Sequence, residues 1–78
     1  MSYYNYNFEL GKELKELRKK TGKTIEQISE ETGVTPKSVA NWERGLTPRN
    51  KLFHRHLDSL GISSEKRIEL VQLAYGKR

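Results

Sequence analysis

The chain has 78 residues and a formal net charge of +5 at pH 7, with 15 Lys or Arg against 10 Asp or Glu. This length allows one small domain and leaves no room for a deep catalytic cleft between two lobes. The absence of cysteine excludes disulfide bonds and thiolate zinc sites. No apolar stretch is long enough for a membrane span or a secretion signal, so we expect a soluble cytoplasmic protein.

The first predicted helix spans residues 8–21. Asn7 is a suitable N-cap, and Gly22 can end the helix in a left-handed conformation. One apolar stripe follows the i, i+4, i+7 spacing of a helix face and consists of Leu10, Leu14 and Leu17. Residues 1–7, which are rich in tyrosine, are predicted to form a flexible segment before this helix.

A second predicted helix begins after Thr24, which can form a capping box with Gln27. Gly33 ends this helix and suits a left-handed turn into the next one. The inward positions of the second helix are Ile25, Ile28, Ser29 and Thr32.

The third predicted helix begins at Thr35 and Pro36, an N-cap followed by proline at the first helical position, and reaches Arg44. Val39 and Trp42 lie three residues apart and share one face. The opposite face carries Lys37, Ala40, Asn41 and Arg44. Lysine can pair with guanine O6 and N7, asparagine with adenine, and an arginine near the helix end with phosphate. This helix therefore has the chemistry of a major-groove reader.

Thr47 and Pro48 repeat the same start signal and predict a fourth helix that ends at Gly61. Its inward positions are Leu52, Phe53, Leu57 and Leu60. A fifth helix is predicted to begin at Ser63 or Ser64, with a core side made of Ile68, Val71 and Ala74 or Tyr75. No stretch shows the alternation of a strand, so the chain is predicted to be all-α.

The positive charge concentrates in the central stretch 35–56. This stretch has one acid, Glu43, against five bases, which are Lys37, Arg44, Arg49, Lys51 and Arg55. A localised basic face indicates a polyanionic partner, and nucleic acid is the commonest one for a soluble protein. Charge alone is equally consistent with a solubilising surface.

Taken together, these features resemble phage repressor and Cro-type helix-turn-helix proteins, the XRE-type or lambda-repressor-like family. The resemblance covers about residues 8–62 and rests on the segments 10–18, 24–35, 38–45 and 52–62, including the specific Trp-Glu-Arg-Gly ending of the third helix. It implies a compact five-helix lambda-repressor-like domain over residues 8–76, with the helix-turn-helix core at about 24–44.

The resemblance also implies roles for individual residues. Base edges would be contacted by Pro36, Lys37, Ser38 and Asn41. Phosphates would be contacted by Thr24, Arg44, Thr47, Arg49, Asn50 and Lys51. In this family an arginine late in the first helix pairs with the glutamate of the Trp-Glu-Arg-Gly motif, which predicts an ion pair between Arg18 and Glu43. Ile25 replaces a glutamine that commonly binds phosphate, so one polar contact is lost.

A dimer on a two-fold duplex operator is a further implication of the family. Apolar residues outside the core side of the fifth helix indicate a second buried surface. We expect a homodimer interface made of Leu70, Leu73 and Tyr75. An acidic patch on the second helix is either a solvated face or a contact for RNA polymerase or another protein, and it consists of Glu26, Glu30 and Glu31.

The sequence offers no sign of catalysis or of a cofactor. His54 and His56 are two residues apart and point in opposite directions on a helix, so they are poor joint metal ligands. No Ser-His-Asp arrangement is identifiable, and there is no room for an effector-sensing domain. We therefore expect no enzyme, no metal, no cofactor and no small-molecule effector.

The sequence thus predicts a sequence-specific, duplex-DNA-binding transcriptional regulator, a repressor from a phage or other mobile element. The alternative is an antitoxin or adaptor on the same fold, whose main partner is another protein. A third interpretation is a non-specific nucleoid or RNA binder, which would contact phosphates without discriminating between sequences.

Overall fold

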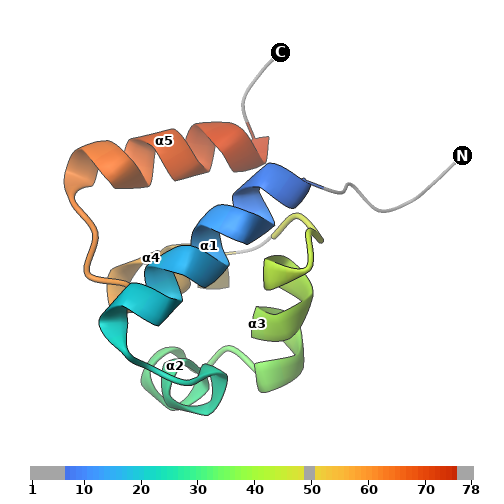
Figure 1. Ribbon diagram of the computed structural model, residues 1–78, viewed down its shortest axis with the longest axis vertical. Helices are drawn as coiled ribbons and strands as arrows, with labels where there is room; N and C mark the ends of the chain where they lie inside the picture. Colours follow the sequence, from blue (N-terminus) through green and yellow to red (C-terminus); the bar gives the residue numbers. More distant parts are fainter. Residues whose placement is uncertain (1–6, 49–50, 76–78) are drawn as a thin grey trace, which may run out of the picture.

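Five helices and their connections make up residues 7–48 and 51–75, the part of the chain that the computed structural model describes (Figure 1). The helices are α1 (Phe8–Thr21), α2 (Ile25–Thr32), α3 (Pro36–Glu43), α4 (Leu52–Ser59) and α5 (Ser64–Tyr75). α1 crosses the middle of the molecule and contacts α3 and α5, while α2 contacts α3 and α4. These residues contain no strand, and the predicted all-α fold is confirmed. None of the helices described is long and apolar enough to cross a membrane.

The first three helices begin at side-chain caps. The Asn7 side chain accepts a hydrogen bond from the backbone N–H of Leu10 at 2.9 Å. Thr24 and Gln27 form the predicted capping box through reciprocal bonds of 3.1 and 2.8 Å. The Thr35 side chain accepts a hydrogen bond from the backbone N–H of Ser38 and so caps α3, and proline follows it at the first helical position. These caps satisfy backbone donors that the first turn leaves without intrahelical partners, and they act within a few residues of the boundary.

The start of α4 differs from the prediction. Thr47 and Pro48 do not open the helix, which begins at Leu52 with Lys51 at the N-cap and no side-chain capping bond. Both predicted start residues are buried instead, Pro48 almost completely. A Thr-Pro pair is a local signal, and here the two side chains fill the interior while their backbone stays non-helical.

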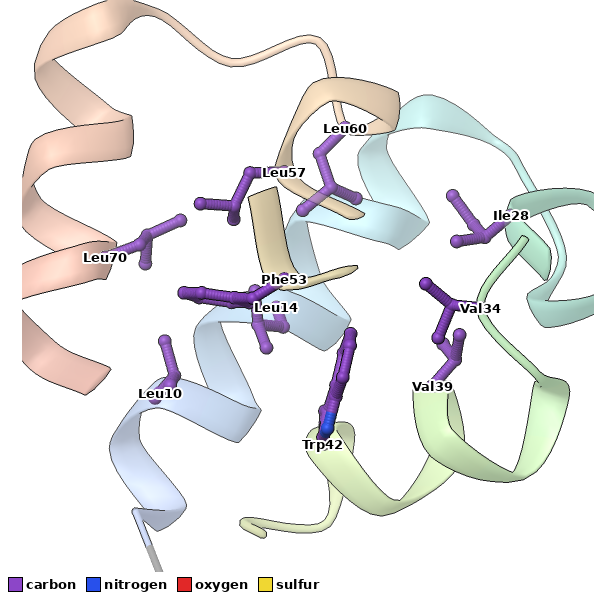
Figure 2. Packing of buried hydrophobic residues seen from close by; sticks show 10 residues of the cluster. All are labelled: Leu10, Leu14, Ile28, Val34, Val39, Trp42, Phe53, Leu57, Leu60 and Leu70. Carbon is purple, nitrogen blue, oxygen red and sulfur yellow. The ribbon is translucent and has the colours of Figure 1, made fainter. Parts of the chain in front are cut away.

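All five helices contribute to one hydrophobic core (Figure 2). The buried members are Leu10, Leu14, Ile28, Val34, Val39, Trp42, Phe53, Leu57, Leu60 and Leu70. Trp42 projects from α3 into this core and meets the ring of Phe53 edge to face, with 6.1 Å between the ring centroids. The largest side chain of α3, the helix predicted to read the major groove, therefore anchors this helix in the centre of the domain.

α5 presents a different face to the core from the one predicted. Leu70 is fully buried, whereas Ile68, expected on the core side, is 57% exposed. Two polar contacts join α5 to α1: Lys66 Nζ lies 3.1 Å from Glu13 Oε1, and Asn7 Nδ2 donates to the Leu73 carbonyl at 2.6 Å. Because apolar residues occur on several sides of α5, its own pattern does not select one inward face, and the contact with α1 does.

The predicted flexible segment 1–7 lies outside the described residues except for its last member. Asn7 makes four hydrogen bonds: its side chain bonds Leu10 and Leu73, its backbone N–H donates to the Gly45 carbonyl at 2.6 Å, and its carbonyl accepts from the N–H of Gly11 at 3.0 Å. Asn7 therefore joins the start of α1 to the end of α3 and to α5, and it belongs to the folded domain.

Candidate nucleic-acid interface

The α3 helix lies at one edge of the molecule, beside α2, with its outer side turned away from the other helices (Figure 1). Its inner side is fixed by Val39, which is fully buried, and by Trp42, which is 5% exposed. The predicted orientation of these two side chains is confirmed. Because both anchors lie on one face, the residues opposite them must point outward.

The outer side of α3 carries the side chains predicted to contact bases. Pro36 and Lys37 are exposed, and Ser38 and Asn41 are half-buried. Asn41 Oδ1 accepts a hydrogen bond from Nη1 of the exposed Arg44 at 3.3 Å, so the amide lies on the outer surface. Lys37 and Asn41 are four residues apart and lie on one side of α3, whereas Pro36 and Ser38 lie toward the two edges of this outer side.

The turn between α2 and α3 is held by local bonds. Gly33 adopts a φ of 79°, a conformation that favours glycine, and its N–H donates to the Ser29 carbonyl at 2.9 Å. The Thr32 hydroxyl donates to the Ile28 carbonyl at 2.8 Å and accepts from the N–H of Val34 at 3.1 Å. Val34 is fully buried below the turn, which fixes the angle between the two helices.

An ion pair connects α1 to the end of α3. Arg18 donates from Nε and Nη2 to the two carboxylate oxygens of Glu43, at 2.7 and 3.1 Å, and from Nη1 to the Lys23 carbonyl at 3.0 Å. The side chains of Arg18 and Glu43 are only 13% and 5% exposed. The hydrogen bond to Glu43 raises the pKa of the Arg18 guanidinium above its usual value. One guanidinium thus holds the end of α3 and the loop that leads into α2.

The residues predicted to contact phosphate fall into three groups. Thr24, Arg44 and Lys51 are exposed at helix ends, where a phosphate can reach them. Thr47 is only 8% exposed, so its burial removes it from the predicted contacts. Arg49 and Asn50 lie outside the described residues.

A shallow hollow of about 200 Å³ lies where α1, α2 and α3 meet. Its lining consists of Lys15, Arg18, Ile25, Ala40, Glu43 and Arg44. Among the described side chains, neither Lys15 nor Arg44 pairs with a carboxylate, so the hollow carries two uncompensated cations. Sequence reasoning missed Lys15, although its position three residues before Arg18 places the two on neighbouring parts of α1.

The burial of His56 was not predicted from the sequence. This side chain is fully buried, and its ring lies 5.3 Å from that of Trp42, whereas His54 is exposed. Burial lowers the pKa of His56 to about 4, so the imidazole is neutral near pH 7. Among residues 7–48 and 51–75, no three His, Cys, Asp or Glu side chains gather where they could hold a metal ion.

The burial of His56 can be explained by its spacing. It lies three residues after Phe53 and one before Leu57, the two inward residues of α4, which places it on their side of the helix. Sequence reasoning compared the two histidines with each other and not with these apolar neighbours.

An α2–turn–α3 unit with buried apolar anchors and an exposed polar outer helix defines a helix-turn-helix domain. The chain belongs to the helix-turn-helix domain family, whose model matches residues 9–70. This family groups XRE-like DNA-binding domains, so the resemblance to Cro- and XRE-type proteins is confirmed. The domain is that of a DNA-binding regulator. No curated protein and no solved structure gives a significant match.

Proposed function

We propose that the protein binds duplex DNA in a sequence-specific manner, as a binding protein rather than an enzyme, and represses transcription by covering a promoter. The observation that carries this proposal is the orientation of α3, which buries Trp42 and presents Lys37, Asn41 and Arg44 on the outer side. A helix of this kind fits the major groove, where its side chains reach base edges.

Phosphate contacts on either side of α3 would hold the domain in register. Thr24 lies at the amino end of α2, where unpaired backbone N–H groups and the helix dipole attract anions. Lys51 lies at the amino end of α4, and Arg44 at the carboxyl end of α3. These three exposed residues come from three helix ends, and we propose that they contact the DNA backbone together with Lys15 of the hollow beside Arg44.

A homodimer on a two-fold operator is the second part of the proposal, with half-sites about 34 Å apart. Leu70 no longer belongs to the expected interface, because it is buried in the core of the monomer. Tyr75 is 49% exposed and Leu73 is half-buried. Ile68 is seven residues before Tyr75 and therefore on the same side of α5, so these two side chains form the proposed surface. Leu73 is two residues before Tyr75, lies on another side of the helix and packs against the core.

Sedimentation tests the dimer directly. We expect the wild-type chain to sediment as a dimer at tens of micromolar and Ile68→Glu to sediment as a monomer, because a charge on the apolar outer face of α5 disfavours its burial. Lys20→Ala, which lowers the net charge by the same one unit at an exposed position of α1, is the control. A wild-type monomer at these concentrations would contradict the dimer.

DNA binding is tested by selecting bound duplexes from a random library and measuring affinities for the enriched site and for random DNA. Asn41→Ala should weaken binding to the enriched site by about 1–3 kcal/mol and leave binding to random DNA nearly unchanged, because base contacts discriminate and phosphate contacts do not. Lys20→Ala, which removes one exposed charge from α1, serves as the control. Equal losses on both DNAs would show that Asn41 does not read bases.

Exposed apolar side chains favour the alternative, an adaptor or antitoxin that binds another protein. Ile68 and Tyr75 lie on the same side of α5 and are 57% and 49% exposed, so they offer an apolar surface that another protein could cover. This alternative predicts that no sequence is enriched from the library and that Ile68→Glu abolishes binding to a partner protein. Enrichment of a sequence that depends on Asn41 would reject it.

A further inference from the structure

We infer that Asn7 is a positioning residue that fixes α5, and with it the proposed dimer surface, relative to α3, and so sets the distance between the two half-sites that the dimer reads. This role rests on the proposed dimer on duplex DNA and concerns the geometry of that complex. The contacts of Asn7 bring three helices together at one point, which are the start of α1, the end of α3 and the last turn of α5 (Figure 1).

The Asn7 side chain connects two helices through both ends of its amide. Oδ1 accepts from the backbone N–H of Leu10 at 2.9 Å, which caps α1, and Nδ2 donates to the Leu73 carbonyl of α5 at 2.6 Å. These partners fix the orientation of the amide, because the reverse orientation would place a donor against an N–H and an acceptor against a carbonyl. One side chain therefore holds α5 against the first turn of α1.

The bond to Leu73 satisfies a group that α5 itself leaves without a partner. α5 ends at Tyr75, so the Leu73 carbonyl is one of the last four, which have no intrahelical donor. Leu70 is the one fully buried residue of α5, and the apolar residues beside it are only partly buried. Because apolar residues occur on several sides of α5, packing alone permits more than one rotation of this helix. The bond from Asn7 selects the one observed.

The ion pairs of α5 lie nearer its start and are more exposed. Lys66 lies 3.1 Å from Glu13 of α1, and Arg67 pairs with Asp58 of α4. Each of these four side chains is at least 31% exposed, and ion pairs at the surface fix a geometry only weakly. The bond from Asn7 is short and partly buried, so it is the polar contact that holds the last turn of α5.

The backbone of Asn7 joins the same residue to the end of α3. Its N–H donates to the Gly45 carbonyl at 2.6 Å, just beyond the last turn of that helix. Because the proposed dimer surface is on α5 and the base-reading side chains are on α3, a shift of α5 on α1 moves the two surfaces relative to each other. In a two-fold dimer this shift occurs in both subunits and changes the distance between the two α3 helices.

Half-site spacing tests this role with three proteins, which are wild type, Asn7→Ser and Ile28→Val. Serine still caps α1 and keeps the backbone bond to Gly45, but its side chain is too short to bond both Leu10 and Leu73. Ile28→Val removes one carbon from the core at α2 and controls for a modest loss of stability. Each protein is measured on the operator enriched from the library, on this operator with two base pairs inserted between its half-sites, and on a single half-site.

The insertion rotates one half-site by about 70° and moves it by about 7 Å, so a rigid dimer cannot bind both half-sites of the longer operator. Wild type and Ile28→Val should prefer the original operator by about 10-fold or more. In Asn7→Ser this preference should fall below about 3-fold, because a loosely held α5 lets the two subunits adjust to the longer spacing. Its affinity for the single half-site should stay at the wild-type value, and it should still sediment as a dimer.

A wild-type spacing preference in Asn7→Ser would overturn the positioning role. An equal loss of affinity on all three duplexes would also overturn it, because Asn7 would then act on α3 itself. Asn7→Asp is the second variant if Asn7→Ser does not fold. Its carboxylate caps α1 but has no donor for the Leu73 carbonyl, so it should relax the preference in the same way.

The proposed function fails in a different way from the role of Asn7. If wild type itself binds the two operators equally, the proposed dimer on DNA is wrong, and the role of Asn7 falls with it. A library that yields no enriched sequence would overturn the proposed function itself. A spacing preference that is present in wild type and lost only in the Asn7 variants supports both.

Discussion

Gly11 shows how a single missing side chain shapes the domain. A β-carbon at this position would lie 2.8 Å from the carbonyl oxygens of Trp42 and Glu43 and 2.9 Å from the Gly45 nitrogen. All three are backbone atoms, which cannot move aside as a flexible side chain can. The close approach of α1 to the end of α3 therefore requires glycine at this helical position, where it is otherwise unfavourable.

We expect Gly11→Ala to lower the free energy of unfolding by about 1–3 kcal/mol, because overpacking against backbone outweighs the better helix propensity of alanine. Urea denaturation measures the change. Lys12→Ala, at the next and exposed position of α1, should change stability by less than about 0.5 kcal/mol. A more stable Gly11→Ala protein would mean that α1 and α3 are not in this contact.

His56 makes stability depend on pH. Its pKa is lowered to about 4 by burial, whereas an unfolded chain has a histidine pKa of about 6.5. Below pH 6.5 the unfolded state binds the proton more readily, so stability is lost as pH falls from about 6.5 toward 4 and is unaffected above that range.

The loss between pH 7 and pH 5 should be about 2 kcal/mol in the wild type, as measured by urea denaturation at each pH. His56→Leu should remove most of this slope, since it removes the buried titrating group. His54→Gln changes an exposed histidine of the same helix and should keep the wild-type slope. Equal slopes in the wild type and His56→Leu would argue against a buried neutral His56.

At the scale of the helices, the Arg18–Glu43 pair fixes how α1, α2 and α3 meet. It is largely buried and bidentate, and the same guanidinium also bonds the Lys23 carbonyl before α2. Charge pairs of this kind are costly to break one side at a time, because the remaining charge stays buried without a partner.

We expect Arg18→Met and Glu43→Gln each to lower the free energy of unfolding by about 2–4 kcal/mol, and the double substitution to lower it by less than the sum. Lys66→Met removes the solvent-exposed pair between α5 and Glu13 and should leave the denaturant midpoint nearly unchanged. Denaturant midpoints of the four variants check this. Additive losses in the double variant would show that the two side chains do not interact.

At the scale of the whole molecule, part of the uncompensated positive charge lies beside α3. Lys15 lines the same hollow as Arg44, although it comes from α1. Lys20 is five residues further along α1 and points about 140° away from Lys15 around the helix. The two lysines therefore have equal charge and a different position relative to the proposed DNA.

Lys15→Ala should reduce the salt dependence of DNA binding by about one unit of the log–log slope, as expected for one phosphate contact, on specific and random DNA alike. Lys20→Ala should leave the slope nearly unchanged. Affinity measured by fluorescence anisotropy over a series of salt concentrations distinguishes the two. Identical slopes for both variants would place the hollow away from the DNA backbone.

The sequence by itself determined the features that depend on neighbours a few residues apart. The caps at Asn7, Thr24 and Thr35 predicted where α1, α2 and α3 begin, and the spacing of Val39 and Trp42 predicted which side of α3 is buried. Capping bonds and helical periodicity are local, so no knowledge of the rest of the chain is needed to apply them.

Tertiary packing alone decided the remaining features. Pro48 became a buried residue instead of a helix start, and Leu70 entered the core in place of Ile68. Arg44 donates a hydrogen bond to Asn41 Oδ1, a contact that sequence spacing permits but does not require. In each case several local solutions have similar free energies, and contacts with distant segments or neighbouring side chains select one of them.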